Sequence, residues 1–181
     1  MSDTHRSEYE KQLAGEEFWN SDPEISAKKS YARDLCDQYN LPRESEPERR
    51  LELLQTLFGN CDDKIFIKPP FHCDFGYNIH VGKNFFANFD VVFLDTGKIT
   101  IGDNCLIGMG ATLLDNAVVP SGCIIAANAL VLSNAKLEPN SVYAGVPAKK
   151  VKEVTPEQRE EIIRRTAHDY MLYASWFKED E

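Results

Sequence analysis

The sequence predicts a mainly β protein whose centre is a solenoid of short parallel strands, and three observations lead to this fold class. A large apolar residue recurs every six residues from Ile101 to Tyr143. A small residue follows four positions after each member of that column, from Cys105 to Pro147. The segment that carries this repeat has no net charge, whereas both ends of the chain are acidic. Because a helix repeats every 3.6 residues and a strand every two, neither explains a period of six.

The two columns have different expected places in the solenoid. The apolar column should point inward, and it comprises Ile101, Ile107, Leu113, Val119, Ile125, Val131, Leu137 and Tyr143. The small column should fit where the chain turns a corner, and it comprises Cys105, Ala111, Ala117, Cys123, Ala129, Ala135, Ser141 and Pro147. Glycines at 102 and 108 follow the first two apolar residues. This alternation indicates strands of one face each, separated by corners.

The period also predicts how the coils stack. Three faces of six residues make a coil of 18 residues, which places Cys105, Cys123 and Ser141 directly above one another as corner residues. A looser version of the repeat precedes residue 101, and a slip of two residues between Phe93 and Ile101 resets its register.

Charge divides the 181 residues into three expected segments. The chain has 20 Lys and Arg against 29 Asp and Glu, a net charge of −9. Residues 1–64 contribute −6, residues 65–154 contribute zero and residues 155–181 contribute −3. We therefore expect a helical N-terminal module over 1–64, the solenoid over 65–154 and an amphipathic C-terminal helix over 155–181.

Both ends have helical signals. Residues 7–58 read as helical, and one expected helix places Ala27, Tyr31, Leu35 and Tyr39 near one face. Pro47 can open a second helix that stops at Gly59, with leucines 51, 54 and 57 and Phe58 inward. Residues 155–158 (TPEQ) form a capping box, and an apolar and aromatic stripe over 162–177 is expected to pack on a coil face or a neighbouring subunit.

Composition excludes several classes of protein. The acidic balance argues against nucleic-acid binding, which needs a basic face. No apolar run approaches the roughly 18 residues of a membrane span, and the N-terminus lacks the apolar core of a signal peptide, so we expect a cytoplasmic protein. Five scattered cysteines without a CxxC pair fit reduced thiols better than a disulfide framework or a zinc knuckle.

The first half of the chain resembles a known enzyme family. The stretches that match are residues 13–18 (LAGEEF) with 22–24 (DPE), 70–82 (PFHCDFGYNIHVG), 84–95 (NFFANFDVVFLD) and 101–108 (IGDNCLIG). Over residues 9–108 these are similar to the maltose and galactoside O-acetyltransferases, which are hexapeptide-repeat acyltransferases. The resemblance implies a left-handed parallel β-helix behind a helical N-terminal module, a homotrimer, and transfer of acetyl from acetyl-CoA to a sugar hydroxyl.

The resemblance also implies site residues. By their positions in the family motifs, Asn88 and Asp95 would line the acceptor-sugar site, and Asp74 matches another sugar-contacting position. The alternative for all three is a turn-forming role. Lys149 and Lys152 fall where the family carries basic residues for the coenzyme A phosphates, and Ala127 is a small position for close approach. The alternative for the lysines is a solvated charge cluster.

No residue is identified as the catalytic base. Acetyl transfer requires the hydroxyl proton to be removed as the oxygen attacks the thioester, and histidine suits that task near neutral pH. In the family this histidine follows the IGDN stretch in an extended loop, whereas here the repeat continues uninterrupted and no histidine lies between His80 and His168. His5, His72, His80 and His168 are expected to have structural or solvent roles.

From Ile107 the resemblance changes. Residues 107–178 are similar to the C-terminal part of gamma-class carbonic anhydrase-like proteins, in segments such as 107–112 (IGMGAT) and 139–151 (PNSVYAGVPAKKV). That family binds zinc through three histidines, and the ligand positions here are not histidines, so no metal is expected.

Three functions are therefore open. The first is a maltose- or galactoside-type O-acetyltransferase, weak or inactive because its base is missing. The second is a non-catalytic trimeric β-helix scaffold or a recombined chimera, and the third, which the missing ligands disfavour, is a carbonic anhydrase relative.

Overall fold

The computed structural model describes residues 6–41 and 46–161. Three helices come first: α1 (Glu8–Leu13), α2 (Pro23–Asn40) and α3 (Pro47–Leu57). Short strands follow, and in the described residues they are β1 (Ile65–Ile67), β2 (Phe71–Cys73), β3 (Ile79–Val81), β4 (Phe85–Ala87), β5 (Val91–Phe93), β6 (Ile99–Ile101), β7 (Leu106–Ile107), β8 (Thr112–Leu113), β9 (Val118–Val119), β10 (Ile124–Ile125), β11 (Leu130–Val131), β12 (Ser141–Ala144) and β13 (Lys149–Glu153).

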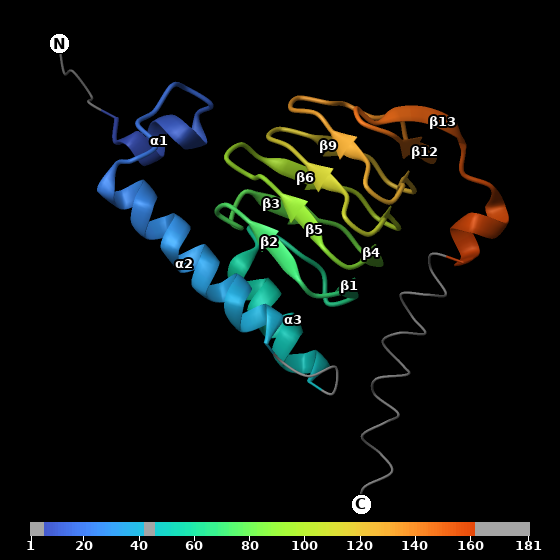
Figure 1. Cartoon of the computed structure of the whole chain (residues 1–181), viewed down its shortest axis with the longest axis horizontal. Coiled ribbons are helices and arrows are strands. Elements are labelled where there is room, and N and C mark those ends of the chain that lie inside the picture. The colour runs from blue at the N-terminus through green and yellow to red at the C-terminus, as the bar shows by residue number, and fades with distance from the viewer. Residues whose placement is uncertain (1–5, 42–45, 162–181) are drawn as a thin grey trace, which may run out of the picture.

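The strands form three sheets that wrap around a common core, which confirms the expected parallel β-helix. One sheet has the order β1-β4-β7-β10-β12-β13, a second β2-β5-β8-β11 and a third β3-β6-β9. All neighbours pair in parallel except β12 and β13, which are antiparallel. Figure 1 shows the coils stacked from β1 and β2 at one end to β12 and β13 at the other.

Coil length changes along the stack. In the later coils Ile107 pairs with Ile125, 18 residues on, as the period of six predicts. In the earlier coils Ile65 pairs with Phe85, 20 residues on. The two extra residues lie between β2 and β3 and again between β5 and β6, so the slip before Ile101 has a counterpart one coil earlier. These two longer corners stack on each other.

The predicted columns fill the core as expected over most of their length. From Ile101 to Val131 every member of the apolar column is at most 2% exposed, and Tyr143 is buried. The small column is buried from Cys105 to Ala129 and again at Ser141. Towards the end of the stack Leu137 and Ala135 are only partly buried and Pro147 is exposed, because few residues follow to cover them.

The corners carry a signal that the two columns do not contain. Backbone with positive φ recurs every six residues from Asn104 to Asn140, and all of these positions are asparagine or glycine. The left-handed region strains most side chains, but asparagine tolerates it and glycine has no Cβ to clash. A column of asparagine and glycine, one position before the small column, therefore marks each corner.

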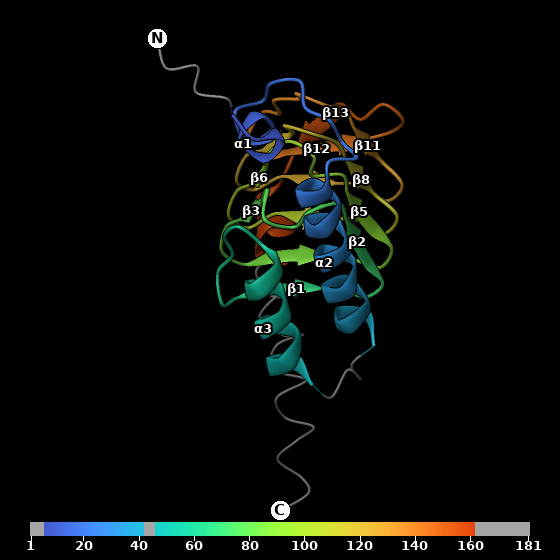
Figure 2. The same ribbon diagram turned by 90° about the vertical axis from the view of Figure 1, so that its left-hand side faces the viewer.

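The helices close the first coil. Figure 2 shows α2 and α3 side by side across the end of the stack where β1 and β2 lie. Leucines 53, 54 and 57 of α3 join the core of the first coils. The buried stripe of α2 is Ile25, Ala32, Leu35, Cys36 and Tyr39. Of the four residues expected near one face, Leu35 and Tyr39 belong to this stripe, whereas Ala27 and Tyr31 are exposed because the stripe runs along a neighbouring face.

One outer face of the β-helix is apolar. Outward side chains of the six-stranded sheet form a ladder of register partners: Phe66, Phe86, Leu106, Ile124 and Val142. Phe66 and Phe86 stack with ring centroids 6.0 Å apart and form a cluster separate from the main core. The corresponding ladder of the three-stranded sheet is more polar, with His80, Thr100 and Val118.

The C-terminal helix begins where the capping box predicts. The Thr155 Oγ1 accepts the backbone N–H of Gln158, and the Gln158 Oε1 accepts that of Thr155, both at 3.2 Å. Residues 156–161 are helical, and the stripe predicted over 162–177 lies outside the described residues. Within the part of the chain that the structure describes, no helix is long and apolar enough to cross a membrane.

Candidate functional site

Asp95 lies at the second of the two longer corners and is fully buried. Its Oδ1 accepts the backbone N–H groups of Asp74 and Phe75, each at 2.9 Å, and so holds the corner of the preceding coil. Its Oδ2 has no hydrogen-bond partner among the described residues. Burial raises the pKa of the Asp95 carboxyl to about 6, against the opposing effect of the two N–H donors.

Asp74 and its neighbours line a hollow of about 350 Å³ between α2 and the first two coils. The Asp74 Oδ2 accepts a hydrogen bond from Thr96 Oγ1 at 3.3 Å. The lining residues are Arg33, Cys36, Asp37, His72, Cys73, Asp74, Val92 and Leu94. Charged groups of both signs therefore face this hollow together with one imidazole.

Asn88 lies on a different corner. It follows β4, it is half-buried, and its Oδ1 accepts the N–H of Phe89 at 2.9 Å, as in a turn. The structure thus brings Asp74 and Asp95 into contact, whereas Asn88 does not line the hollow that Asp74 lines. Asp95 does not line it either, because its side chain lies beneath the corner.

Two of the histidines are in the described residues. His72 is exposed in β2 and lines the hollow two residues before Asp74. His80 lines a second hollow of about 520 Å³ between α1 and the corners of the third sheet. Burial and the nearby Lys98 lower the pKa of His80. His5 and His168 lie outside the described residues.

The positions implied for coenzyme A lie near the other end of the stack. A Cβ placed on Gly108 would lie 2.5 Å from the backbone nitrogen of Ala127, so adjacent coils approach closely there. Lys149 and Lys152 are exposed in β13, opposite Ala144 and Val142. In the six-stranded sheet, β13 lies four strands from β4, in the coil of Asp95, and five strands from β1, in the coil of Asp74. At about 4.8 Å between neighbouring strands, the lysines are about 20 Å from these two coils along the axis.

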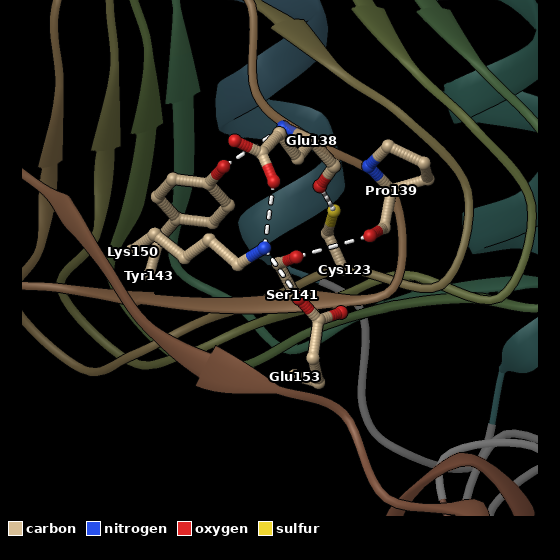
Figure 3. A network of polar contacts seen from close by, with 7 residues as sticks. All are labelled: Cys123, Glu138, Pro139, Ser141, Tyr143, Lys150 and Glu153. Atoms are coloured by element: carbon tan, nitrogen blue, oxygen red, sulfur yellow. Dashed lines mark hydrogen bonds and ion pairs between the residues drawn. The ribbon is translucent and has the colours of Figure 1, made fainter.

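A polar network distinguishes the lysines of β13 (Figure 3). The Lys150 Nζ pairs with Glu138 Oε2 at 2.6 Å and also with Glu153, and these contacts raise the pKa of Lys150. The Glu138 N–H donates to the Tyr143 hydroxyl, which joins the network to the core. No carboxylate among the described residues pairs with Lys149 or Lys152, so their charges remain available to an anion.

Sequence reasoning missed several features of these sites. It did not pair Cys36 with Cys73, whose sulfurs are 3.5 Å apart, or place Arg33 and His72 at the hollow. Only the docking of α2 onto β2 brings these residues together, and no spacing in the sequence encodes it. The column of asparagine and glycine at every sixth position could have been recognised in the sequence as the mark of the corners. Among the described residues, no group of three His, Cys, Asp or Glu is placed to hold a metal ion.

Both the helical part and the solenoid of the chain match known protein families. Residues 11–62 match the maltose acetyltransferase hexapeptide capping motif, and residues 98–133 match the bacterial transferase hexapeptide, six repeats. The chain is 40% identical over 103 residues to nodulation protein L of Rhizobium meliloti, covering 57% of this chain and 56% of that protein. It is 34% identical over 100 residues to the galactoside O-acetyltransferase of Escherichia coli, covering 55% and 49%. These alignments span about half the length of the relatives.

Solved structures agree over more of the chain. A maltose O-acetyltransferase from Clostridium difficile has a TM-score of 0.69 and 28% identity, covering 83% of this chain and 98% of that one. A hexapeptide-repeat acetyltransferase from Vibrio cholerae, solved with acetyl-CoA, has a TM-score of 0.61 and 29% identity, covering 83% and 100%. The resemblance of residues 107–178 to carbonic anhydrase-like proteins gains no support from these matches and stays a prediction. The chain carries the maltose acetyltransferase capping motif in front of a hexapeptide-repeat β-helix, and the proteins it is similar to include a galactoside and a maltose O-acetyltransferase.

Proposed function

We propose that this protein is an acetyl-CoA-dependent sugar O-acetyltransferase whose turnover is weak or absent. The observation that carries the proposal is the shared arrangement of capping helices and hexapeptide coils, which matches a maltose O-acetyltransferase over 83% of the chain. The proposed reaction moves an acetyl group from the coenzyme A sulfur to a sugar hydroxyl, with loss of the hydroxyl proton.

The hollow beside Asp74 is the proposed place for the acceptor. Its volume of about 350 Å³ is within the range of small-molecule pockets, about 300–1,000 Å³. Asp74 offers a carboxylate that can accept hydrogen bonds from sugar hydroxyls. In this proposal Asp95 supports the site from below by fixing the backbone of Asp74. Asn88, on a different corner, would contact only a part of the acceptor that extends beyond this hollow.

Acetyl-CoA is proposed to extend along the coil stack. Lys149 and Lys152 would meet its phosphates, and Ala127 would let it lie close to the backbone. Since these lysines are about 20 Å from the acceptor residues along the axis, the cofactor must span several coils to bring its thioester to the hollow.

The missing base is the reason for weak turnover. General-base catalysis contributes about 10²–10⁴-fold to such reactions, and the family's histidine is absent because the chain continues directly from Gly108 into β8. His72 is the described histidine that shares the hollow with Asp74, so it is the side chain whose replacement must be tested.

The proposed assembly is a cytoplasmic homotrimer. Phe66 and Phe86 of the apolar ladder are already buried within the chain, whereas Leu106, Ile124 and Val142 are partly exposed, which supports burial of this part of the face against another surface. Exposed apolar side chains elsewhere on the coils, at Phe89, Met109 and Leu132, support it further. With a net charge of −9, nucleic acid is not an expected partner.

A non-catalytic scaffold is the second candidate. The uninterrupted run of coils from β7 to β11 favours it, because this run replaces the loop that would carry the catalytic histidine. A carbonic anhydrase relative remains the least supported candidate, since the expected ligand positions are not histidines.

Two assays separate these candidates. Calorimetric titration with acetyl-CoA should show binding in the native protein and a rise in Kd of about 100-fold or more in the double variant K149A/K152A, since two charged hydrogen bonds of about 1.5–3 kcal/mol each are lost. The matched control is K136A, which removes an exposed lysine from another sheet. Thiol release with maltose, glucose and galactosides should be slow. Absence of acetyl-CoA binding would favour the scaffold, and fast turnover lost in H72A would show that the base is present.

A further inference from the structure

Two cysteines from distant parts of the chain face each other where the helical cap meets the β-helix. Cys36 lies in the buried stripe of α2, and Cys73 ends β2. Their sulfur atoms are 3.5 Å apart and share a hydrogen bond. A disulfide requires a separation of about 2.05 Å, so the sulfurs need to close by about 1.5 Å. That distance is within reach of small side-chain rotations on both elements.

The pair is open to small molecules from one side. Both cysteines line the hollow of about 350 Å³, and Cys73 is half-buried there. The other three cysteines differ. Cys105 and Cys123 are buried corner residues whose thiols donate to the carbonyls of Pro120 and Glu138. Cys61 is a partly buried free thiol with no sulfur partner among the described residues, and burial raises its pKa to about 11.

The surroundings of the pair govern how readily it ionises. The hydrogen bond from Cys73 lowers the pKa of Cys36, while the same contact and burial raise that of Cys73. The carboxylates of Asp37, Asp74 and Asp95 oppose ionisation of one or both thiols. The Arg33 guanidinium from α2 and the His72 imidazole from β2 also line the hollow. Cys36 is therefore the thiol that ionises first, and thiolates are the species that attack disulfides.

We propose that Cys36 and Cys73 form a reversible disulfide, made by exchange with a low-molecular-weight disulfide, that crosslinks α2 to β2. One cysteine thiolate attacks the small disulfide, forming a mixed disulfide and releasing one small thiol. The second cysteine thiolate then attacks the protein sulfur of the mixed disulfide and releases the second small thiol. The two cysteines lose two electrons and two protons, and the small disulfide gains them as two thiols.

The crosslink joins the two walls of the hollow. Cys36 belongs to the wall formed by α2, and Cys73 is adjacent to Asp74 in the wall formed by the first coil. Oxidation closes a covalent loop that contains all of α3 and β1. It therefore fixes the cap against the β-helix. This inference goes beyond acetyl transfer and does not depend on it, because the chemistry needs only the two thiols.

The test starts from the full chain equilibrated with excess oxidised glutathione at pH 8. The count of free thiols after denaturation should fall from five to three, and dithiothreitol should restore five. Tryptic digestion without reduction should yield one species in which residues 34–43 are linked to residues 65–83. The mass on a non-reducing gel should stay that of one chain.

Three variants make the result decisive. C73S and C36S should each abolish the linked peptide, while C61S, the matched control, should keep it. If C36S does not fold, C73S still decides, because its side chain is only half-buried. In the native sequence, oxidation should move the urea unfolding midpoint upward, and C73S should show no such shift. Five free thiols after equilibration, or a linked peptide that contains another cysteine, would overturn the proposal.

Discussion

Replacement of Asp95 by asparagine tests the role of the buried carboxyl at the longer corner. The carboxyl is fully buried, accepts two backbone N–H groups through Oδ1, and has no partner for Oδ2 among the described residues. Asparagine keeps the shape and the accepting oxygen but cannot become charged. It places an NH₂ group where Oδ2 lies, and an unpartnered buried donor costs about 1–3 kcal/mol at every pH.

The pKa of Asp95 sets the pH dependence. Folding raises this pKa from 3.8 to about 6, so between these values the native state binds a proton that the unfolded state does not. The free energy of unfolding therefore falls as pH rises from about 4 to 6 and is level above that range. At ~1.36 kcal/mol per pKa unit the loss is about 3 kcal/mol. D95N has no such loss, so relative to the native protein it should gain about 3 kcal/mol over this interval.

Urea unfolding at pH 4, 5, 6, 7 and 8, at one protein concentration, measures the difference between the two proteins. The matched control is D103N, since Asp103 also accepts a backbone N–H from the preceding coil, that of Lys83, but is exposed. It removes a corner carboxylate without removing a buried one. A difference between D95N and the native protein that stays constant from pH 4 to pH 8 would refute the reasoning, whatever its absolute size.

Three further predictions concern packing and assembly. Gly108→Ala should lower the free energy of unfolding by about 1–3 kcal/mol in urea, because its Cβ would lie 2.5 Å from the Ala127 nitrogen; an unchanged midpoint would show that the coils can separate. Tyr39→Phe should lower the free energy of unfolding by about 1–3 kcal/mol, because it removes the hydroxyl that donates to the Ile67 carbonyl at 2.5 Å. Tyr31→Phe, at an exposed position, should leave the free energy of unfolding unchanged. Equal effects of the two substitutions would contradict this prediction. Light scattering at micromolar concentration should give the mass of a trimer, and a stable monomer would disprove the assembly.

The repeat was predictable because each coil solves the same packing problem with the same residue types. Ile107 and Ile125 are equivalent in sequence and become register partners in space. The slip before Ile101 was also visible. Its counterpart between Cys73 and Val81 was not recognised. Without that second slip, the contact of the Asp95 carboxyl with the backbone of Asp74 could not be foreseen.

Features that depend on docking of separate elements could not be derived from period or composition. The buried face of α2 is decided by how the helix meets β2, which is why Tyr31 is exposed while Cys36 reaches Cys73. The same docking creates the hollow beside Asp74. Of the lysines in β13, only the structure shows that Lys150 is engaged by Glu138 and Glu153, which leaves Lys149 and Lys152 for an anion.

The pH dependence of thiol release from acetyl-CoA, with maltose as acceptor, tests the central claim most directly. Without a histidine base, proton removal depends on hydroxide, so the logarithm of kcat/KM should rise steadily from pH 5.5 to pH 9 without a plateau. The rate should be similar in the native protein, H72Q and H80Q. A plateau that begins near pH 6 to 7 and disappears in either histidine variant would contradict the account, since it would show that this chain supplies its own catalytic base.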